Sequence, residues 1–240
     1  MSTLALTYPD YMNAVSYFLA YGSDYTAISA DRSARCDAIV QAGLRQFYFP
    51  SPVAESFKGW SFMEPATGTI TTVASTQAYD LPANFGRIEG PLSYPSEYGG
   101  PAVFVIDESD VRIMDSYANT TGRSLYASVR PKTTDGSADQ LWQCLLWPTP
   151  NMATTLTFKY ALSPPKLTVT NPYPYGGIFH HETIKESCLS VAEHDEDDTP
   201  GLHTQKFKER LTASVLYDRQ AGTHEYFGYN LDTSVSDGMW

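Results

Sequence analysis

Residues 140–150 of the chain read QLWQCLLWPTP. The part from Gln140 to Trp147 is rich in aromatic and apolar side chains, and Pro148 and Pro150 follow it immediately. Aromatic runs of this length favour a β-strand, and proline ends a strand because it has no backbone N–H to give to the ladder. The stretch therefore predicts a strand that stops at Trp147, and it places β structure in the middle of the chain.

Short β-branched and aromatic runs of the same kind lie on both sides of this strand, and each is bounded by Pro, Gly, Asp or Asn. Such runs predict strands, and their boundary residues predict turns. One segment between the runs, residues 107–117, predicts a short helix instead, with Val111 and Met114 facing inward. The further predicted strands cover residues 69–73, 102–106, 124–129 and 154–160.

Helical spacing replaces the strand pattern toward the N-terminus. Thr7 can cap a first helix over residues 8–21, with Asp10 where a carboxylate faces the positive end of the helix. A second helix is predicted over residues 29–48, and Pro50 ends it. The apolar stripe of this second helix consists of Cys36, Ile39, Val40, Leu44 and Phe47.

Helical spacing also returns after Pro172 and predicts helices over residues 179–193 and 203–221. Residues 194–201, between these helices, read HDEDDTPG and predict a solvated turn. The stripe of the first helix consists of His181, Ile184, Cys188 and Val191, and that of the second consists of Phe207, Leu211, Ser214 and Val215.

Neither helix pair can bury its stripe alone, so we expect the two pairs to pack together. The sequence thus predicts an α+β fold in which the N- and C-terminal helix pairs, residues 1–55 and 173–225, form a helical bundle. Residues 56–172 form an inserted, mainly antiparallel β domain in this prediction. The apolar residues of the segment 226–240 do not repeat at helical or strand spacing, and Gly and Ser interrupt them, which predicts an extended C-terminal tail.

The charge of the chain argues against a protein that grips nucleic acid. The net charge is −11, and the 16 basic residues are scattered, whereas phosphate binding needs clustered Lys and Arg. Residues 173–240 alone hold five basic and twelve acidic side chains. An acidic surface can still surround DNA and let it slide. We therefore expect an acidic group to face a channel or a solvated rim; its members are Glu193, Asp195, Glu196, Asp197 and Asp198.

The sequence contains none of the motifs that mark a nucleophile elbow, a phosphate loop, a dinucleotide site or a zinc protease. His180, His181 and His194 are interpreted as ordinary polar residues of a helix rather than metal ligands. Cys36, Cys144 and Cys188 lie far apart without metal spacing, and we expect them to be buried as small apolar side chains. The sequence predicts a protein without catalytic residues, cofactor or metal.

The N-terminal apolar stretch carries Pro9 and Asp10 and lacks the basic region of a signal peptide. No apolar run approaches the length of about 20 residues that spans a bilayer. We therefore expect synthesis and assembly in a host cytoplasm, with no membrane partner.

A set of local patterns occurs in a fixed order along the chain. Residues 60–63 read WSFM, residues 77–85 read QAYDLPANF, residues 145–150 read LLWPTP, and residues 155–160 read TLTFKY. A closing helix opens with Phe179, His180 and His181. Each piece has a structural interpretation, since Leu81-Pro82 can end a strand. Four aromatic residues, Trp60, Phe62, Trp142 and Trp147, can pair across a sheet.

This ordered set, on a helix–strand–helix frame, resembles the head-to-tail adaptor (connector) and tail-tubular proteins of tailed bacteriophages. The resemblance covers residues 1–220. It implies a structural virion protein of the neck or tail that forms a homo-oligomeric ring, usually dodecameric. It further implies that the ring docks on the portal protein, contacts the next tail, stopper or nozzle protein, and encloses a channel through which genomic DNA passes without specific binding.

The predicted tail fits this implied role. Its large side chains are too apolar for a freely solvated terminus, and Gly and Ser interrupt them too often for independent folding. Such a segment usually becomes ordered on a partner, and aromatic anchors supply most of the binding energy. We expect it to bind the portal or a neighbouring subunit through Tyr226, Phe227, Tyr229, Leu231, Met239 and Trp240.

Three other classes of protein share part of this pattern. A tail terminator or baseplate subunit would share the β content, although the flanking helices argue against it. A tail-associated wall hydrolase would need a pair of carboxylates, which need not be close in sequence. A carbohydrate-binding module is suggested only by the abundance of Trp and Tyr.

Overall fold

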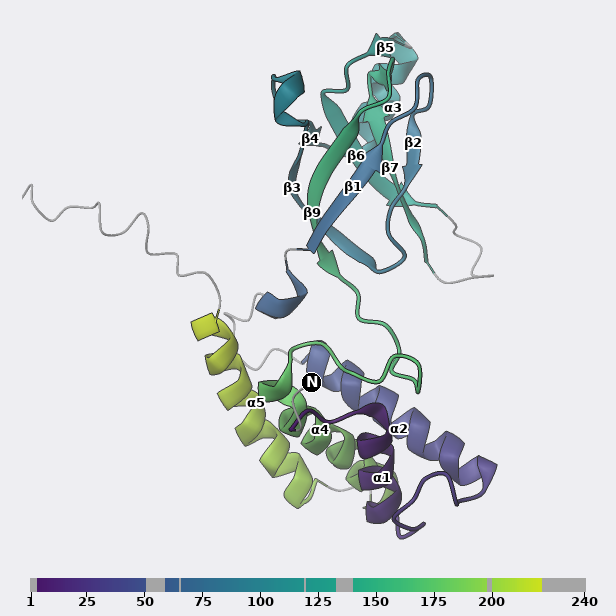
Figure 1. The fold of residues 1–240 in the computed structure, drawn as a ribbon, viewed down its shortest axis with the longest axis vertical. Coiled ribbons are helices and arrows are strands. Elements are labelled where there is room, and N and C mark those ends of the chain that lie inside the picture. Colours follow the sequence, from purple (N-terminus) through teal and green to yellow (C-terminus); the bar gives the residue numbers. More distant parts are fainter. Residues whose placement is uncertain are drawn as a thin grey trace, which may run out of the picture. The chain divides into compact units, whose positions relative to one another are not determined.

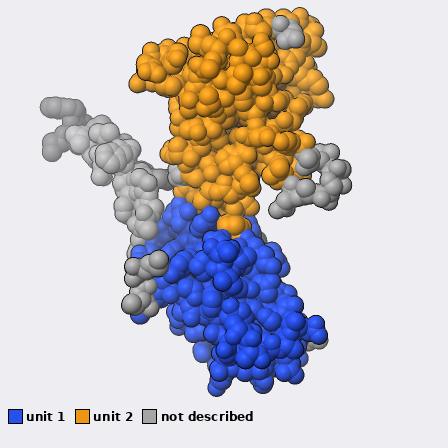
Figure 2. Space-filling model, turned by 45° about the vertical axis from the view of Figure 1, so that its right-hand side comes forward, with its two compact units in different colours: residues 1–62, 166–240 blue, residues 63–165 orange. Residues whose placement is uncertain are grey.

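The computed structural model describes residues 4–50, 59–64, 66–118, 120–132, 140–197 and 200–221. The chain divides into two compact units (Figure 2). One comprises residues 1–62 and 166–240 and is called the helical unit here; the other comprises residues 63–165 and is called the β unit. Helices and mainly antiparallel strands occur together, which confirms the predicted α+β class.

The helical unit consists of α1 (Tyr8–Phe18), α2 (Ala30–Tyr48), α4 (Ile178–Asp197) and α5 (Leu202–Ala221). Helix α4 packs against the three others (Figure 1). The predicted stripe of α2 is buried in full, and so are most members of the stripes of α4 and α5. Segments that lie more than a hundred residues apart in the sequence therefore share one core, as the two predicted helix pairs required.

Helix α1 begins as the sequence predicts and ends earlier. The Asp10 carboxylate accepts hydrogen bonds from the Thr7 backbone N–H (2.7 Å) and from the Thr7 hydroxyl (2.6 Å). The Thr7 side chain in turn accepts a bond from the Asp10 N–H, which completes a capping box. The predicted end at residue 21 is wrong because Ala20 adopts the left-handed conformation (φ 55°), which stops the helix at Phe18.

The β unit contains two main sheets (Figure 1). In the first, β9 (Thr155–Leu162) pairs antiparallel with β1 (Ala66–Thr71) on one side and β3 (Phe85–Ser93) on the other. The second has the order β2-β7-β6-β4, and a separate short pair joins β5 to β8. Among the strand pairings of the described residues, the two-residue pairings β4–β6 and β5–β8 are parallel and the others are antiparallel. The remaining bounds are β2 (Ala78–Asp80), β4 (Phe104–Val105), α3 (Glu108–Tyr117), β5 (Thr121–Gly122), β6 (Tyr126–Pro131), β7 (Trp142–Trp147) and β8 (Thr149–Pro150).

Strand β3 is the longest of the strands that the sequence pattern misses. Its residues include Gly86, Gly90 and Pro91, which interrupt any alternation of apolar and polar side chains. The pairing with β9 shifts register twice, between Phe85 and Arg87 and between Glu89 and Ser93. Gly90 has a φ of 72°, a conformation that a side chain disfavours. The strand is therefore built around bulges, which local periodicity cannot reveal.

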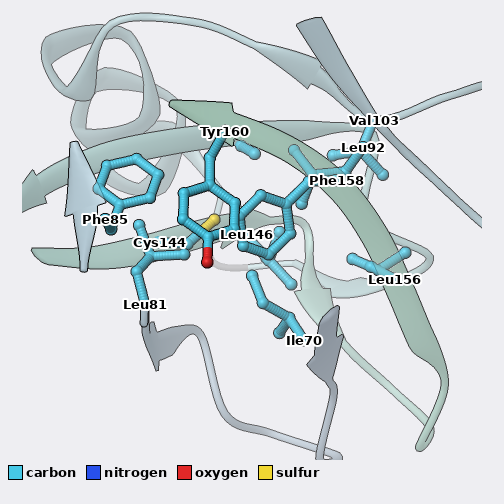
Figure 3. Packing of buried hydrophobic residues seen from close by; sticks show 11 residues of the cluster. Ile70, Leu81, Phe85, Leu92, Val103, Cys144, Leu146, Leu156, Phe158 and Tyr160 are labelled. Atoms are coloured by element: carbon cyan, nitrogen blue, oxygen red, sulfur yellow. The ribbon is translucent and has the colours of Figure 1, made fainter. Parts of the chain in front are cut away.

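The two main sheets of the β unit enclose an apolar core (Figure 3). Phe85 stacks on Tyr160 with ring centroids 5.7 Å apart, and Phe158 contacts Tyr160 at 5.6 Å. A side chain on Gly68 of β1 would collide with the Phe158 ring, so the sheet requires glycine there. Other buried members of this core are Ile70, Leu81, Leu92, Val103, Ala127, Cys144, Leu146 and Leu156.

The aromatic residues expected to pair across a sheet divide between the two units. Tyr126 of β6 lies opposite Trp147 of β7, with ring centroids 6.1 Å apart, as cross-strand pairing predicts. Trp60 and Phe62 lie in no sheet, so the expectation is wrong for them. They pack instead on Phe47 of α2, at 4.6 and 6.5 Å between ring centroids. Their aromatic character serves the core of the helical unit.

All three cysteines are buried and free, as the sequence predicts. Burial raises the pKa of the Cys144 and Cys188 thiols to about 12, so both stay protonated and unreactive at neutral pH. Cys188 faces α2, where its sulfur lies 3.7 Å from the Val40 carbonyl oxygen. Both residues therefore pack as small apolar side chains.

Candidate assembly surfaces

Glu193 stands at the end of α4, where it caps the start of α5. Its carboxylate accepts hydrogen bonds from the backbone N–H groups of Gly201 (3.0 Å), His203 (3.2 Å) and Thr204 (3.0 Å). The Thr204 hydroxyl donates a fourth bond at 2.8 Å. A Cβ on Gly201 would collide with this carboxylate, so glycine is needed for the close approach. Glu193 thus satisfies several of the free amides that begin every helix.

The expectation that Glu193 belongs to a solvated acidic group is wrong, because the residue is only 7% exposed. Burial by itself would raise the pKa of this carboxyl. The hydrogen bonds from Thr204, His203 and Gly201 outweigh that effect and lower the pKa to about 2. The charge of Glu193 therefore stabilises the start of α5 within the helical unit.

We expect Glu193→Gln to lower the free energy of unfolding by about 1–2 kcal/mol at neutral pH, because an amide offers one acceptor oxygen where the carboxylate offers two. The folded-state pKa is depressed, so the contribution is complete above pH 4.5 and is lost as the pH falls toward 2. Urea titrations of both proteins at pH 7 and pH 3 measure the difference. Glu209→Gln removes the same charge from an exposed site of α5 and is the matched control; equal effects of the two substitutions would contradict the cap.

Asp195 and Glu196 lie on α4, which continues to Asp197 through the segment predicted to be a turn. Arg35 of α2 holds both of them, with Nη2 at 2.6 Å from Asp195 Oδ2 and 3.0 Å from Glu196 Oε1. All three side chains are more than a third exposed, so these ion pairs add little stability. The orientation of these carboxylates toward a channel or rim remains a prediction. The side chain of Asp197, the whole of Asp198 and the predicted tail residues Tyr226, Phe227, Tyr229, Leu231, Met239 and Trp240 lie outside the described residues.

Phe179 of α4 and Tyr217 of α5 form an exposed aromatic pair on the helical unit. Their ring centroids are 4.3 Å apart, and Phe179 is 66% exposed. Ring contacts continue inward from Tyr217 to His180 at 5.9 Å and from His180 to Trp60 at 5.4 Å. An exposed apolar side chain that is held rigidly by a core suits a contact with another protein.

Sequence reasoning missed the aromatic pair because it followed the buried stripe of α4. Phe179 precedes His181 by two positions and so lies off that stripe, on the face expected to be polar. A large aromatic residue on a polar helix face is the signal that was available. His181 itself is buried, and its Nδ1 accepts a hydrogen bond from the Leu6 N–H at 2.8 Å. Within the described part of the chain, no three metal-ligating side chains converge.

A cavity of about 160 Å³ is the candidate site of the β unit. Its lining comes from segments as distant as Thr72 and Thr154, which explains why no sequence pattern marks it. Arg123 lies beside it, with the guanidinium carbon 4.1 Å from the centroid of the Tyr94 ring. None of the helices in the described ranges has the length and apolar character that a bilayer span requires.

These features define a two-unit α+β protein whose candidate sites are contact surfaces: a rigid aromatic pair, a helix end with paired charges, and a small cavity. The chain belongs to the SU10 adaptor protein family, whose model matches residues 6–228. It is therefore a phage structural protein of the adaptor type, located in the virion. No curated protein matches the chain. The resemblance to phage adaptors drawn from the ordered motifs is confirmed at this level.

Proposed function

We propose that the protein is a ring-forming head-to-tail adaptor that docks on the portal, encloses the DNA channel and presents a surface to the next tail, stopper or nozzle protein. The observation that carries the proposal is the family membership over residues 6–228, nearly the whole chain. An adaptor must contact at least two kinds of neighbour. The exposed pair Phe179–Tyr217 offers the helical unit a rigid apolar contact, which supports assembly into a larger structure.

The charge distribution supports a ring around DNA. The chain carries a net charge of −11, so a lumen lined by it repels phosphates rather than binding them. At physiological salt this repulsion extends over roughly 8 Å. We assign Asp195 and Glu196, with the adjoining Asp197 and Asp198, to the channel or a solvated rim. Arg35 neutralises part of this group, so the repulsion is moderate.

Electron microscopy of the purified full-length protein, alone and mixed with portal-bearing heads, tests the proposal. We expect rings, dodecameric on the portal, with a central opening wide enough for duplex DNA. A protein that stays monomeric at all concentrations and leaves the portal bare would contradict it. Binding of the same protein at the distal end of tails would favour a tail terminator instead.

Deletion of residues 226–240 tests the partner-binding segment. We expect the melting temperature to stay nearly unchanged and attachment to portal-bearing heads to be abolished, since aromatic anchors dominate such interfaces. Co-sedimentation with heads measures attachment, and differential scanning calorimetry measures stability. Replacement of Ser234 and Ser236 by alanine changes the same segment without removing an anchor, and it should leave attachment intact. Normal docking of the truncated protein would remove the assigned role.

A further inference from the structure

The lining of the cavity of the β unit includes Gly122 of β5 and Pro150 of β8, and hydrogen bonds fix two of its other side chains. The Tyr94 hydroxyl donates to the Ser124 carbonyl oxygen at 2.9 Å, and the Thr72 hydroxyl donates to the Met152 carbonyl oxygen at 2.9 Å. Tyr98 and Met152 add exposed apolar surface to the lining. Cofactor pockets usually measure roughly 300–1,000 Å³, so a cavity of about 160 Å³ suits a single large side chain.

Arg123 is held in place at this cavity. Its guanidinium lies over the Tyr94 ring at 4.1 Å, and Nη1 donates to the Tyr98 carbonyl oxygen at 3.4 Å. Gly100 lies close to the same guanidinium, and its φ of +112° favours glycine at this position. The fork of donors is therefore preorganised, which reduces the entropy lost when it binds an acceptor.

The charge of the cavity is opposite to that of the protein. Arg123 is the single charged residue of its lining, and no carboxylate among the described residues pairs with it. A planar guanidinium binds a carboxylate through two parallel hydrogen bonds. The cavity thus suits a peptide that brings a carboxylate and a large apolar side chain together. A nucleic acid fits less well, because one cation on a chain of net charge −11 provides little attraction for a phosphate backbone.

We propose that this cavity is the docking site for residues 237–240 of a second copy of the chain, with Trp240 in the cavity and the Asp237 carboxylate on Arg123. The segment reads DGMW, and residues 222–240 contain three acidic residues and no Lys or Arg. Fifteen residues lie between Ala221 and Asp237, enough for an extended reach of roughly 50 Å. The proposal rests on the ring assigned above, and it makes the neighbouring subunit the partner of the tail.

Disulfide trapping in the full-length protein tests the docking site. Met152 lines the cavity and Met239 adjoins Trp240, so a chain with Met152→Cys and Met239→Cys brings two thiols together only when the segment docks. The native cysteines are buried and do not interfere. Val169 is exposed on the helical unit, and Val169→Cys combined with Met239→Cys measures random collision. Mild oxidation followed by a non-reducing gel gives the readout.

We expect a ladder of covalent dimers and larger multimers well above the Val169→Cys control. Arg123→Gln and Asp237→Asn should each lower the trapping rate about tenfold, the effect of losing a charge-assisted bond. The exchange Arg123→Asp with Asp237→Arg should restore it. A trapped monomer would assign the segment to its own chain and overturn the proposal, as would trapping no faster than the control.

Further outcomes separate this inference from the proposed function. Trapping that is indifferent to Arg123→Gln overturns the site. Binding of a labelled oligothymidylate that Arg123→Gln abolishes would assign the cavity to nucleic acid and overturn it as well. Rings on the portal without the ladder of trapped multimers would overturn the docking site and would still support the adaptor function. Loss of rings and portal binding in the unmodified protein would instead remove the function.

Discussion

Trp60→Ala is expected to lower the free energy of unfolding of the helical unit by about 3–5 kcal/mol. Trp60 is 1% exposed and stacks on Phe47 at 4.6 Å and on Phe62 at 5.3 Å. Its indole N–H donates to the Phe47 carbonyl oxygen at 3.1 Å, in the last turn of α2, where carbonyl groups have no partner within the helix. Truncation would therefore leave a cavity and free a buried carbonyl group at once.

The two units allow this effect to be localised. Circular dichroism at the helical band follows mainly α1, α2, α4 and α5, since α3 of the β unit has only 10 residues. The fluorescence of Trp142 and Trp147 follows the β unit once Trp240 is replaced by phenylalanine. We expect the helical transition alone to move to lower urea. Phe49→Ala, at an exposed position next to the end of α2, is the control and should change little. A loss below about 1 kcal/mol for Trp60→Ala, the size of an average substitution, would show that the ring cluster does not anchor this unit.

Gly43→Ala is the second substitution with a large expected effect. The test is whether the substitution raises or lowers the free energy of unfolding. Alanine is a better helix former than glycine by about 1 kcal/mol, so propensity alone predicts a more stable protein. Gly43 lies where α2 crosses α4, and a Cβ there would stand 2.6 Å from the Cys188 Cα and 2.7 Å from its backbone nitrogen. Backbone atoms cannot move aside without shifting a helix. We expect a net loss of about 2–3 kcal/mol.

Urea unfolding followed by circular dichroism measures this loss. Ala38→Gly, at an exposed site of the same helix, reports propensity alone and should cost about 1 kcal/mol. Cys188→Ala in the Gly43→Ala background removes only the sulfur from the clash, so most of the loss should persist. A more stable Gly43→Ala protein would show that α2 and α4 lie farther apart than their contacts indicate.

The helices were predictable because their causes are local. Thr7 and Asp10 stand three residues apart and form the capping box by themselves. The stripe from Cys36 to Phe47 repeats at helical spacing, which needs no knowledge of what covers it. Helix ends were less predictable. Helix α1 ends early because Ala20 is left-handed. Helix α4 continues to Asp197, and its residues Asp195 and Glu196 pair with Arg35 of α2.

The contact surfaces were harder to predict because their parts are distant in the sequence. Glu193 was grouped with its acidic neighbours, although it caps α5 across the turn. Phe179 and Tyr217 lie 38 positions apart and meet only because α4 packs on α5. Arg123 gains its place at a cavity from Tyr94 and Gly100, which precede it by more than 20 residues.

The sequence by itself determined the mixed α+β class, the order of helices and strands, the burial of the three cysteines and, through its ordered motifs, the resemblance to phage adaptors. Each of these depends on neighbouring residues or on total composition. Only the tertiary structure decided that Trp60 belongs to the helical core, that Glu193 is a cap, and that Arg123 stands beside a cavity. The physical reason is that burial, pairing and charge environment are set by contacts between segments, and packing chooses those contacts after local structure has formed.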